Sequence, residues 1–349
     1  MKQAIFILPF LLSSIFTIGQ NCNCVENFDY LKATIENDYA GFNDKVNKST
    51  KSDYEKHTEF YRKKILETTT TQRCILLMEK WLEFFNDKHL RISTELNIYW
   101  TFKQIDSTAL LFRIPDFSWS SKPIIDSLIR TNYELITQTP ILIIDLRGNS
   151  GGIDYSYLEL LPLLYTHPYE SKGVEWLASP GNIEIFEKTL ETGTVRNGHE
   201  NDMKELVKVM KENQGSFIAT EETKTDTVRY DRVLRYPQKV GLIVNDFCAS
   251  SCEQFILAGK NSAKTKVFGT NTLGVLDYSN SVPVSLPVEN ISLRYPMTRS
   301  QRLPEYPIDN IGIEPDVKVN LPDNLNVKDE IDDWVLFVKE YLEKELEKK

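Results

Sequence analysis

The stretch Pro140-Ile-Leu-Ile-Ile-Asp-Leu-Arg-Gly-Asn-Ser-Gly-Gly152 joins an apolar run to a polar turn rich in glycine. The run over 140–145 shows no alternation of apolar and polar residues, which predicts a strand buried on both faces of a sheet. The glycines permit a tight turn and let the backbone approach another group closely. A helical pattern then extends through Leu163, so this stretch predicts a strand, a turn and a helix of an α/β fold.

A second strand and turn follow later in the chain. The apolar run Val240-Gly-Leu-Ile-Val244 leads into Asn245-Asp-Phe-Cys-Ala-Ser-Ser251, and a helix is expected over 252–260. Two such turns side by side could supply a nucleophile from one and an oxyanion hole from the other. The alternative is that each turn only connects a strand to a helix, with Ser250 as the helix N-cap.

A nucleophilic serine needs a base, and the chain contains four histidines. His57 lies in a charged helical segment, and His167 and His199 lie in polar loops. His89 differs because it lies where a predicted helix meets a predicted strand. His89 is therefore the candidate base, although a lone histidine is more often structural.

Four blocks in a fixed order carry a resemblance to a known family. They are Ile141 to Gly152, Val244 to Glu253, Val267 to Gly274 and Ile311 to Asp316. These blocks resemble the signatures of the S41 serine peptidases, the C-terminal processing (tail-specific) proteases and their tricorn-core relatives. The resemblance implies an α/β fold with a crotonase/ClpP-like core of ββα units and a small helical N-terminal subdomain ahead of it. It also implies hydrolysis of polypeptide or oligopeptide substrates through an acyl-enzyme.

The resemblance assigns the nucleophile and the oxyanion donors position by position. It implies Ser250 as the nucleophile and the Ser251 backbone N–H, at the start of a helix, as one oxyanion donor. The backbone at Gly151 or Gly152 would supply the other donor.

The base is where this chain departs from the processing proteases. They carry a lysine where this chain has Val275, and a hydrocarbon side chain cannot accept a proton. Asp87-Lys-His-Leu90 resembles the histidine motif of the tricorn-like branch, which implies His89 as the general base. That branch places its acid just before the last block, which implies Asp309, with Glu305 as second choice. Both carboxylates could instead be ordinary solvated groups.

The missing lysine leaves other functions open. The main alternative is a non-catalytic relative that binds peptides or small apolar ligands, and a third is an esterase or amidase. No Cys/His cluster has the spacing of metal ligands, and no glycine-rich loop leads into a phosphate-binding Lys-Ser/Thr pair. We therefore expect no metal and no cofactor. A net charge of −9 argues against nucleic acid as a partner.

The N-terminus and the domain plan follow from composition. Residues 1–20 combine a positive start with a short apolar stretch, which predicts a cleavable export signal, the alternative being an uncleaved anchor. The protein is then expected to be periplasmic or extracellular, without stable membrane insertion after cleavage. The expected parts are a helical N-terminal subdomain over 21–88, a catalytic domain over 89–325 and a C-terminal helix within 326–349. Only about 50 residues separate His89 from Pro140, too few for a PDZ domain.

Several finer expectations complete the prediction. Among five cysteines, Cys24 and Cys74 are the preferred disulfide, and Cys248 and Cys252 are expected to be buried thiols. Residues 166–238 are expected to be a weakly patterned insertion with one helix, over 201–212. A strand pair is expected within 286–295. Trp119 is expected to pack over the core rather than line a cleft.

Overall fold

The computed structural model describes residues 24–67, 71–90, 92, 100–195, 199–221, 223–288, 291–319 and 331–348. The predicted export signal at 1–20 and the expected strand residues Leu96 and Ile98 lie outside these ranges. Within the described ranges, no helix combines the length and the apolar character needed to cross a lipid bilayer.

The described helices, including two 3₁₀ segments, fall into three groups along the chain. The N-terminal group is α1 (Cys24–Asp38), α2 (Phe42–Lys45), α3 (Lys51–Leu66), α4 (Thr71–Leu82) and η1 (Glu83–Phe85). The middle group is α5 (Ser121–Thr131), α6 (Tyr133–Ile136), η2 (Asp154–Leu160), α7 (Leu161–Leu164), α8 (Pro180–Glu191) and α9 (Glu200–Glu212). The last group is α10 (Ser251–Lys260) and α11 (Asp333–Glu347).

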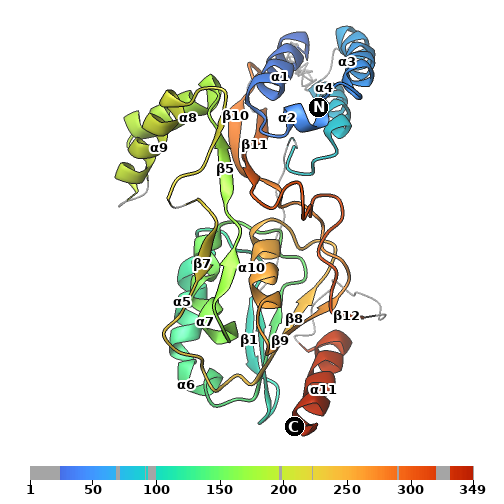
Figure 1. The fold of residues 1–349 in the computed structure, drawn as a ribbon. Coiled ribbons are helices and arrows are strands. Elements are labelled where there is room, and N and C mark those ends of the chain that lie inside the picture. The colour runs from blue at the N-terminus through green and yellow to red at the C-terminus, as the bar shows by residue number, and fades with distance from the viewer. Residues whose placement is uncertain are drawn as a thin grey trace, which may run out of the picture.

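A six-stranded sheet forms the centre of the lower lobe in Figure 1. Its order is β1 (Thr101–Gln104), β2 (Ala109–Arg113), β3 (Ile141–Asp145), β8 (Lys239–Val244), β9 (Thr265–Gly269) and β12 (Val317–Lys318). The β1 strand is antiparallel to β2, and the other neighbours are parallel. Because β3 and β8 are adjacent and parallel, the turns that follow them meet at the same edge of the sheet.

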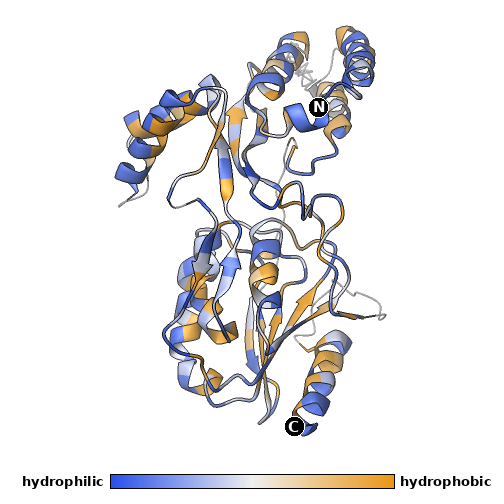
Figure 2. Ribbon diagram, in the orientation of Figure 1, coloured by the Kyte–Doolittle hydropathy of each residue, from blue (hydrophilic) through white to orange (hydrophobic). Residues whose placement is uncertain are grey.

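Helices cover both faces of this sheet. Leu142 and Ile144 of β3 point to the face covered by α5, η2, α7 and α10. Ile141 and Ile143 point to the opposite face, where α11 packs through residues such as Trp334. Figure 2 shows the apolar character of the central strands. This double burial explains why β3 is a continuous apolar run, and it confirms the predicted α/β class.

The upper lobe combines helices with an antiparallel sheet. The sheet order is β10 (Tyr278–Ser285), β11 (Ser292–Ser300), β5 (Val174–Leu177) and β6 (Phe217–Ile218). Phe28 of α1, Trp81 of α4, Phe186 of α8 and Leu293 of β11 belong to one hydrophobic core. The N-terminal helices thus pack on strands from the far end of the chain. The domain boundary at residues 88 and 89 stays a prediction about independent folding units.

Two predictions of local structure were wrong in detail. The 166–238 segment holds α8 as well as α9, contributes β5 and β6 to the upper sheet, and forms a ribbon of β4 (Tyr169–Ser171) and β7 (Asp226–Val228). Its strands are two to four residues long, too short for an alternating pattern to show in the sequence. A strand pair was expected within 286–295, but the observed pair is β10 and β11, and β10 ends before residue 286. The sequence did not indicate β10 because polar residues such as Ser279 and Asn280 interrupt it.

The cysteines follow the prediction. Cys24 of α1 and Cys74 of α4 form a disulfide with a Cα–Cα distance of 5.6 Å. Cys248 and Cys252 are buried free thiols. The disulfide ties the first helix of the upper lobe to the helix that leads toward His89.

Candidate active site

The two turns predicted to meet do lie side by side at the carboxyl edge of the large sheet. The Gly148 N–H donates to Asn245 Oδ1 at 3.1 Å. The Ala249 N–H donates to the backbone oxygen of Asn149 at 3.2 Å. Hydrogen bonds thus run in both directions between the turns, and they fix the relative position of the turns together with strand pairing.

A buried ion-pair network holds the first turn. Asp145 is fully buried and accepts hydrogen bonds from Arg147 Nε at 2.9 Å and Arg113 Nε at 2.8 Å. Burial alone would raise the pKa of Asp145, but the two guanidinium groups lower it overall. Arg147 also pairs with Asp332, the N-cap of α11, at 2.7 Å. The two arginines therefore neutralise the charge of Asp145, and this carboxylate is not available for proton transfer.

Ser250 occupies a strained position at the N-terminus of α10. Its backbone has φ 57° and ψ −125°, a region that residues with a Cβ rarely adopt. The Ser250 N–H donates to the Val275 backbone oxygen and to Glu253 Oε2, each at 2.9 Å. Strain of this kind costs about 1–3 kcal/mol and is concentrated at functional sites, where surrounding contacts hold it in place.

Glu253 provides much of that support, although the sequence analysis used it only to align its block. Its carboxylate is fully buried and accepts four hydrogen bonds. The donors are the backbone N–H groups of Ser250, Gly274 and Val275 and the hydroxyl of Thr272. Glu253 therefore fastens the Ser250 turn to the loop that follows β9.

Gly151 and Gly152 bring the first turn into contact with this serine. Gly151 has φ 92°, and a Cβ there would lie 2.5 Å from the Ala249 backbone oxygen and 2.9 Å from Ser250 Cβ. Gly152 has φ 147° and would meet the Phe117 backbone at 2.3 Å. Only glycine fits either position. The Gly151 N–H already donates to Asn149 Oδ1 at 2.9 Å, so it is engaged within the turn.

His89 lies against a carboxylate two residues earlier in the chain. Its Nδ1 lies 3.3 Å from Asp87 Oδ1, and its backbone N–H donates to the same oxygen at 2.9 Å. The other oxygen of Asp87 accepts a hydrogen bond from the Tyr39 hydroxyl at 2.6 Å. Burial alone would raise the pKa of Asp87, but His89 and the Tyr39 hydroxyl lower it overall. The motif Asp-Lys-His was the available signal for Asp87, which the sequence analysis did not assign a role.

Asp309 joins the same cluster from the loop after β11. One polar atom from each of Asp87, His89 and Asp309 lies within 4.8 Å of the other two, close enough to hold a metal ion. Asp309 Oδ1 accepts from the Leu276 and Asp277 N–H groups at 2.6 and 2.7 Å. Its Oδ2 is buried and has no hydrogen-bond partner among the described residues. Burial, and secondarily the charge of Asp87, raise the pKa of Asp309 to about 7.

Two other residues singled out in the sequence, Glu305 and Trp119, lie at the surface. Glu305 is exposed and lies outside the group that contains His89, so the structure brings Asp309 and not Glu305 to the histidine. Trp119 is 47% exposed, lines the cleft described next, and contacts the Tyr155 ring at 5.9 Å between centroids. The expectation that Trp119 packs over the core was wrong, because Ser118 and Ser120 hold it in a polar segment at the surface.

One large cleft contains most of the expected site. Its volume is about 1230 Å³, and its walls come from both lobes. Five of the expected residues line it: Ser250, Ser251, His89, Gly151 and Gly152. Val275 lines it too. The cleft therefore brings a strained serine, an imidazole and the glycine turn to one solvent-filled space.

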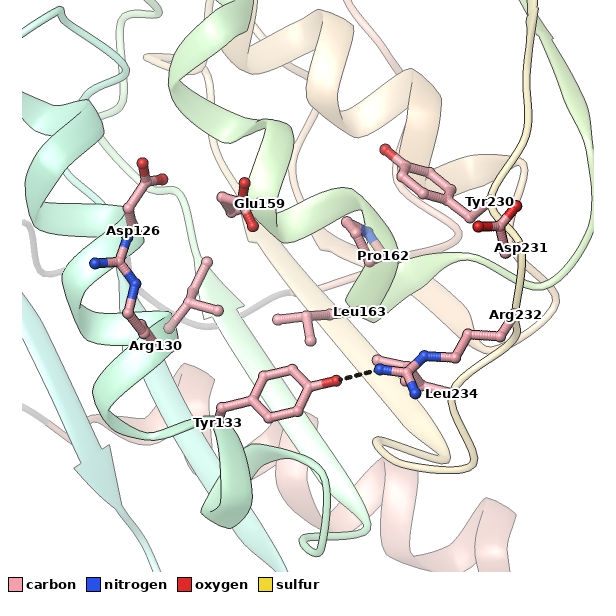
Figure 3. Close-up of a pocket in the computed structure, with 11 residues that line it drawn as sticks. Asp126, Arg130, Tyr133, Glu159, Pro162, Leu163, Tyr230, Asp231, Arg232 and Leu234 are labelled. Carbon is pink, nitrogen blue, oxygen red and sulfur yellow. Dashed lines mark hydrogen bonds between the residues drawn. The ribbon is translucent and has the colours of Figure 1, made fainter.

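A second cavity lies on the outer side of the lower lobe. It has a volume of about 690 Å³ and is formed by α5, the end of η2, α7 and the segment 230–234 (Figure 3). Arg232 Nη2 donates to the Tyr133 hydroxyl across it at 3.2 Å. None of the residues expected in the site lines this cavity.

Solved structures with the same fold cover nearly the whole chain. A candidate peptidase from Parabacteroides merdae is 14% identical, with a TM-score of 0.61 over 91% of this chain and 96% of its own. Mature CPAF is 13% identical, with a TM-score of 0.64 over 92% and 96%. A lipoprotein from Streptococcus agalactiae is 14% identical, with a TM-score of 0.53 over 98% and 100%.

At these identities the structures establish the fold alone. A search of curated proteins found no match to this chain. The family comparison is more specific, because it matches residues 109–319, which include both turns and every strand of the large sheet except β1. The chain therefore belongs to peptidase family S41.

Proposed function

We propose that this chain is an exported serine endopeptidase in which Ser250 is the nucleophile and His89 the general base. The observation that carries the proposal is the shared cleft. Ser250 stands there on a strained backbone at a helix N-terminus, and His89 lines the same cleft with a buried carboxylate behind it. A serine that is only a helix cap does not need a positive φ or an imidazole in the same cleft.

The position of Asp87 favours one direction of proton transfer. His89 Nδ1 lies toward Asp87, and Nε2 has no hydrogen-bond partner among the described residues, so we propose that Nε2 accepts the proton of Ser250 Oγ when substrate is bound. The oxygen then attacks the peptide carbonyl to give a tetrahedral intermediate. His89 returns the proton to the leaving amine, and water later releases the acyl group from Ser250 by the same route.

The developing oxyanion is proposed to bind the Ser251 and Gly152 N–H groups. Ser251 is the first residue of α10, where the helix dipole favours negative charge. Gly152 is preferred to Gly151 because the Gly151 N–H already donates to Asn149. The tight fit of Gly151 against Ser250 would then fix the distance between the two turns.

Two acids are proposed to serve His89 in different ways. Asp87 would be the ionised partner that orients the imidazole, since its pKa is lowered and Tyr39 fixes its second oxygen. Asp309, assigned from the sequence as the third member, has a pKa of about 7 and would carry its proton part of the time at neutral pH. Its ionisation would add a second negative charge beside an imidazolium.

Export is supported by two separate features. The N-terminal sequence has the pattern of an export signal. The Cys24–Cys74 disulfide is typical of an oxidising compartment, such as the periplasm or the extracellular space. The proposed substrates are polypeptides or oligopeptides in that compartment.

One observation favours a second candidate function, a non-catalytic protein that binds peptides or small apolar ligands. Val275 stands where processing proteases of the family carry a lysine, and it is nearly buried in the cleft wall. Such a protein would need the cleft but not the imidazole. The two functions differ in whether peptide bonds break, and not in whether peptides bind.

Peptide hydrolysis by the mature protein tests the proposal. A mixture of synthetic oligopeptides would be incubated with the wild type and with Ser250→Ala, and new termini would be identified by mass spectrometry. New termini that only the wild type produces support the peptidase. A folded wild type that binds peptides but produces no more new termini than Ser250→Ala supports the binding protein instead.

A further inference from the structure

We propose that the cleft selects acidic peptides, so that the substrate class is polypeptide segments rich in aspartate and glutamate. The inference rests on the proposed function for one point only, that the occupant is a peptide. The rest comes from the charges and hydrogen-bond donors that line the cleft.

The lining of the cleft has the opposite charge sign from the molecule as a whole. Six basic residues line it, against two acidic ones. The basic residues are Lys88, Lys172, Lys224, Arg229, Arg294 and Arg302, and the acidic residues are Asp154 and Asp226. The complete chain carries a net charge of −9. An acidic protein that gathers cations in this cleft favours an anionic occupant there.

The cations reach the cleft from separate parts of the fold. Lys172 follows β4, Lys224 and Arg229 flank β7, and Arg294 lies on β11. The Arg294 side chain is held in place by a hydrogen bond from Nη1 to the Ser281 backbone oxygen at 2.9 Å. The positive charge is therefore spread along the cleft wall, as an extended peptide with several carboxylates would require.

Neighbouring acids offset this charge only in part. Lys172 pairs with Glu170, and Lys224 pairs with Glu221, but neither glutamate lines the cleft. Exposed pairs of this kind exchange partners readily, because each contributes less than about 1 kcal/mol. These two lysines can therefore turn to a carboxylate that arrives in the cleft.

Arg302 and Asp154 lie beside the first turn of α10, which carries the proposed nucleophile at its N-cap. Arg302 is buried, donates to Gln254 Oε1 at 3.0 Å, and lies 3.8 Å from Asp277 Oδ1, which offsets part of its charge, while its Nε has no hydrogen-bond partner among the described residues. Asp154 opposes the cations, but its pKa is raised because the cleft walls desolvate its carboxyl, although the residue still faces solvent. Asp154 therefore remains an acid of the cleft lining that opposes the cations.

Hydroxyl groups add to the preference for carboxylates. Ser171, Thr223 and Thr227 line the wall that also carries Lys172 and Lys224, and Ser279 and Ser281 line the wall of β10. A hydroxyl can donate to a carboxylate while the neighbouring cation supplies charge. The cleft is thus rich in cations and in hydroxyl donors, and both bind carboxylates.

Binding of matched peptides to the Ser250→Ala protein tests the inference without turnover. One fluorescent peptide would contain three glutamates, and its partner would contain glutamine at the same positions. Anisotropy titrations would compare them at low and high salt. We expect the glutamate peptide to bind about tenfold more tightly at low salt, since each exposed charge pair contributes roughly two- to fivefold. The advantage should shrink as salt screens the charges.

Charge reversal locates the preference in the cleft. Arg229→Glu should abolish most of the advantage of the glutamate peptide, because Arg229 is exposed and lines the cleft. Arg235→Glu is the matched control, since Arg235 is exposed six residues later and does not line the cleft. Equal or tighter binding of the glutamine peptide, or no peptide binding at all, would overturn the inference. So would an equal loss in both variants.

The outcome of this binding experiment can be distinguished from the outcome of a test of the proposed function. Reaction of Ser250 with a fluorophosphonate, combined with no preference for glutamate, would leave the peptidase standing and remove the acidic substrate class. A preference for glutamate in a wild type that does not react would do the reverse, and would identify the cleft as a binding site for acidic peptides.

Discussion

Asp87 Oδ1 lies 3.3 Å from His89 Nδ1, and only Lys88 separates the two residues in the chain. The second oxygen of Asp87 is bound by the hydroxyl of Tyr39, which follows α1. A buried carboxylate that the helical lobe holds in place thus lies beside the histidine of the cleft. The structure consequently links the N-terminal helices to the proposed chemistry, which the sequence pattern did not indicate.

Asp87→Asn should slow the reaction of Ser250 with a fluorophosphonate by about 100-fold or more. An amide in place of the carboxylate would favour the wrong tautomer of His89 and would not stabilise its protonated form. The rate would be measured as a function of pH by gel fluorescence. Tyr39→Phe, which removes only the donor to Asp87, should cause a smaller loss. Equal rates for Asp87→Asn and the wild type would assign the orienting role to another group.

Asp309→Asn should change how stability depends on pH. In the unfolded chain Asp309 ionises near pH 4, whereas in the folded protein it keeps its proton until about pH 7. Ionisation between these values favours the unfolded chain, so the contribution of Asp309 to stability falls as pH rises from 4 to 7. The asparagine variant does not lose stability in this way. Its free energy of unfolding, relative to that of the wild type, should therefore rise by about 2–4 kcal/mol between pH 4 and pH 8.

Urea unfolding at several pH values measures that difference. The free energy of unfolding of the wild type and of Asp309→Asn would be compared at pH 4, 6 and 8. Parallel curves for the two proteins would mean that Asp309 ionises at its ordinary pKa and is better solvated than the structure indicates.

Gly151→Ala should abolish the fluorophosphonate reaction in a protein that still folds. Its Cβ would lie 2.5 Å from the Ala249 backbone oxygen, so the turn beside Ser250 must move. Gly215→Ala is the matched control, because Gly215 also has a positive φ, of 81°, but has open space around it. Both changes should cost about 1 kcal/mol of backbone strain, and only the first should change the reaction rate. Similar rates for both variants would contradict the close fit.

Glu253→Gln should destabilise the folded protein by about 2–3 kcal/mol. Its carboxylate accepts hydrogen bonds from Ser250, Thr272, Gly274 and Val275, and an amide nitrogen in its place would face donors instead of binding them. Thermal unfolding would show the loss. Exposed Glu212→Gln, at the end of α9, is a control that should leave the melting temperature unchanged.

Replacing both Cys24 and Cys74 by serine should lower the free energy of unfolding by about 4 kcal/mol. This is the stabilisation expected when a disulfide that closes a loop of this length reduces the entropy of the unfolded chain. Because the same lobe supplies Tyr39, Asp87 and His89, the fluorophosphonate reaction should slow as well. Chemical unfolding and labelling of the double variant would be measured together. Unchanged stability would show that the packing of the N-terminal helices does not need the disulfide.

Much of the lower lobe could be predicted because its central strands β2, β3 and β8 are buried on both faces. Continuous apolar runs such as 140–145 and 240–244 followed by polar turns left few alternatives, and parallel pairing brought the turns together. The upper lobe was harder, because its helices and strands come from both ends of the chain and from the 166–238 segment. No local pattern shows that Phe28 and Leu293 belong to one core.

Prediction of the site was limited in the same way, because contacts between distant segments leave no local pattern in the sequence. Ser250 and the glycine turn were identified by local sequence, since each motif occupies a few consecutive residues. Asp87 was passed over because its role depends on a hydrogen bond from Tyr39, which is 48 residues away in the chain. The charge of the cleft depends on residues scattered from Lys88 to Arg302, and only the folded chain brings them together.

Reaction of the mature protein with a fluorophosphonate, with the adduct located by mass spectrometry, tests the central claim most directly. The account predicts a single adduct on Ser250, formed at neutral pH, absent in Ser250→Ala and slowed by at least about 100-fold in His89→Ala. A folded protein that forms no adduct, or that reacts at an undiminished rate in His89→Ala, would contradict the account.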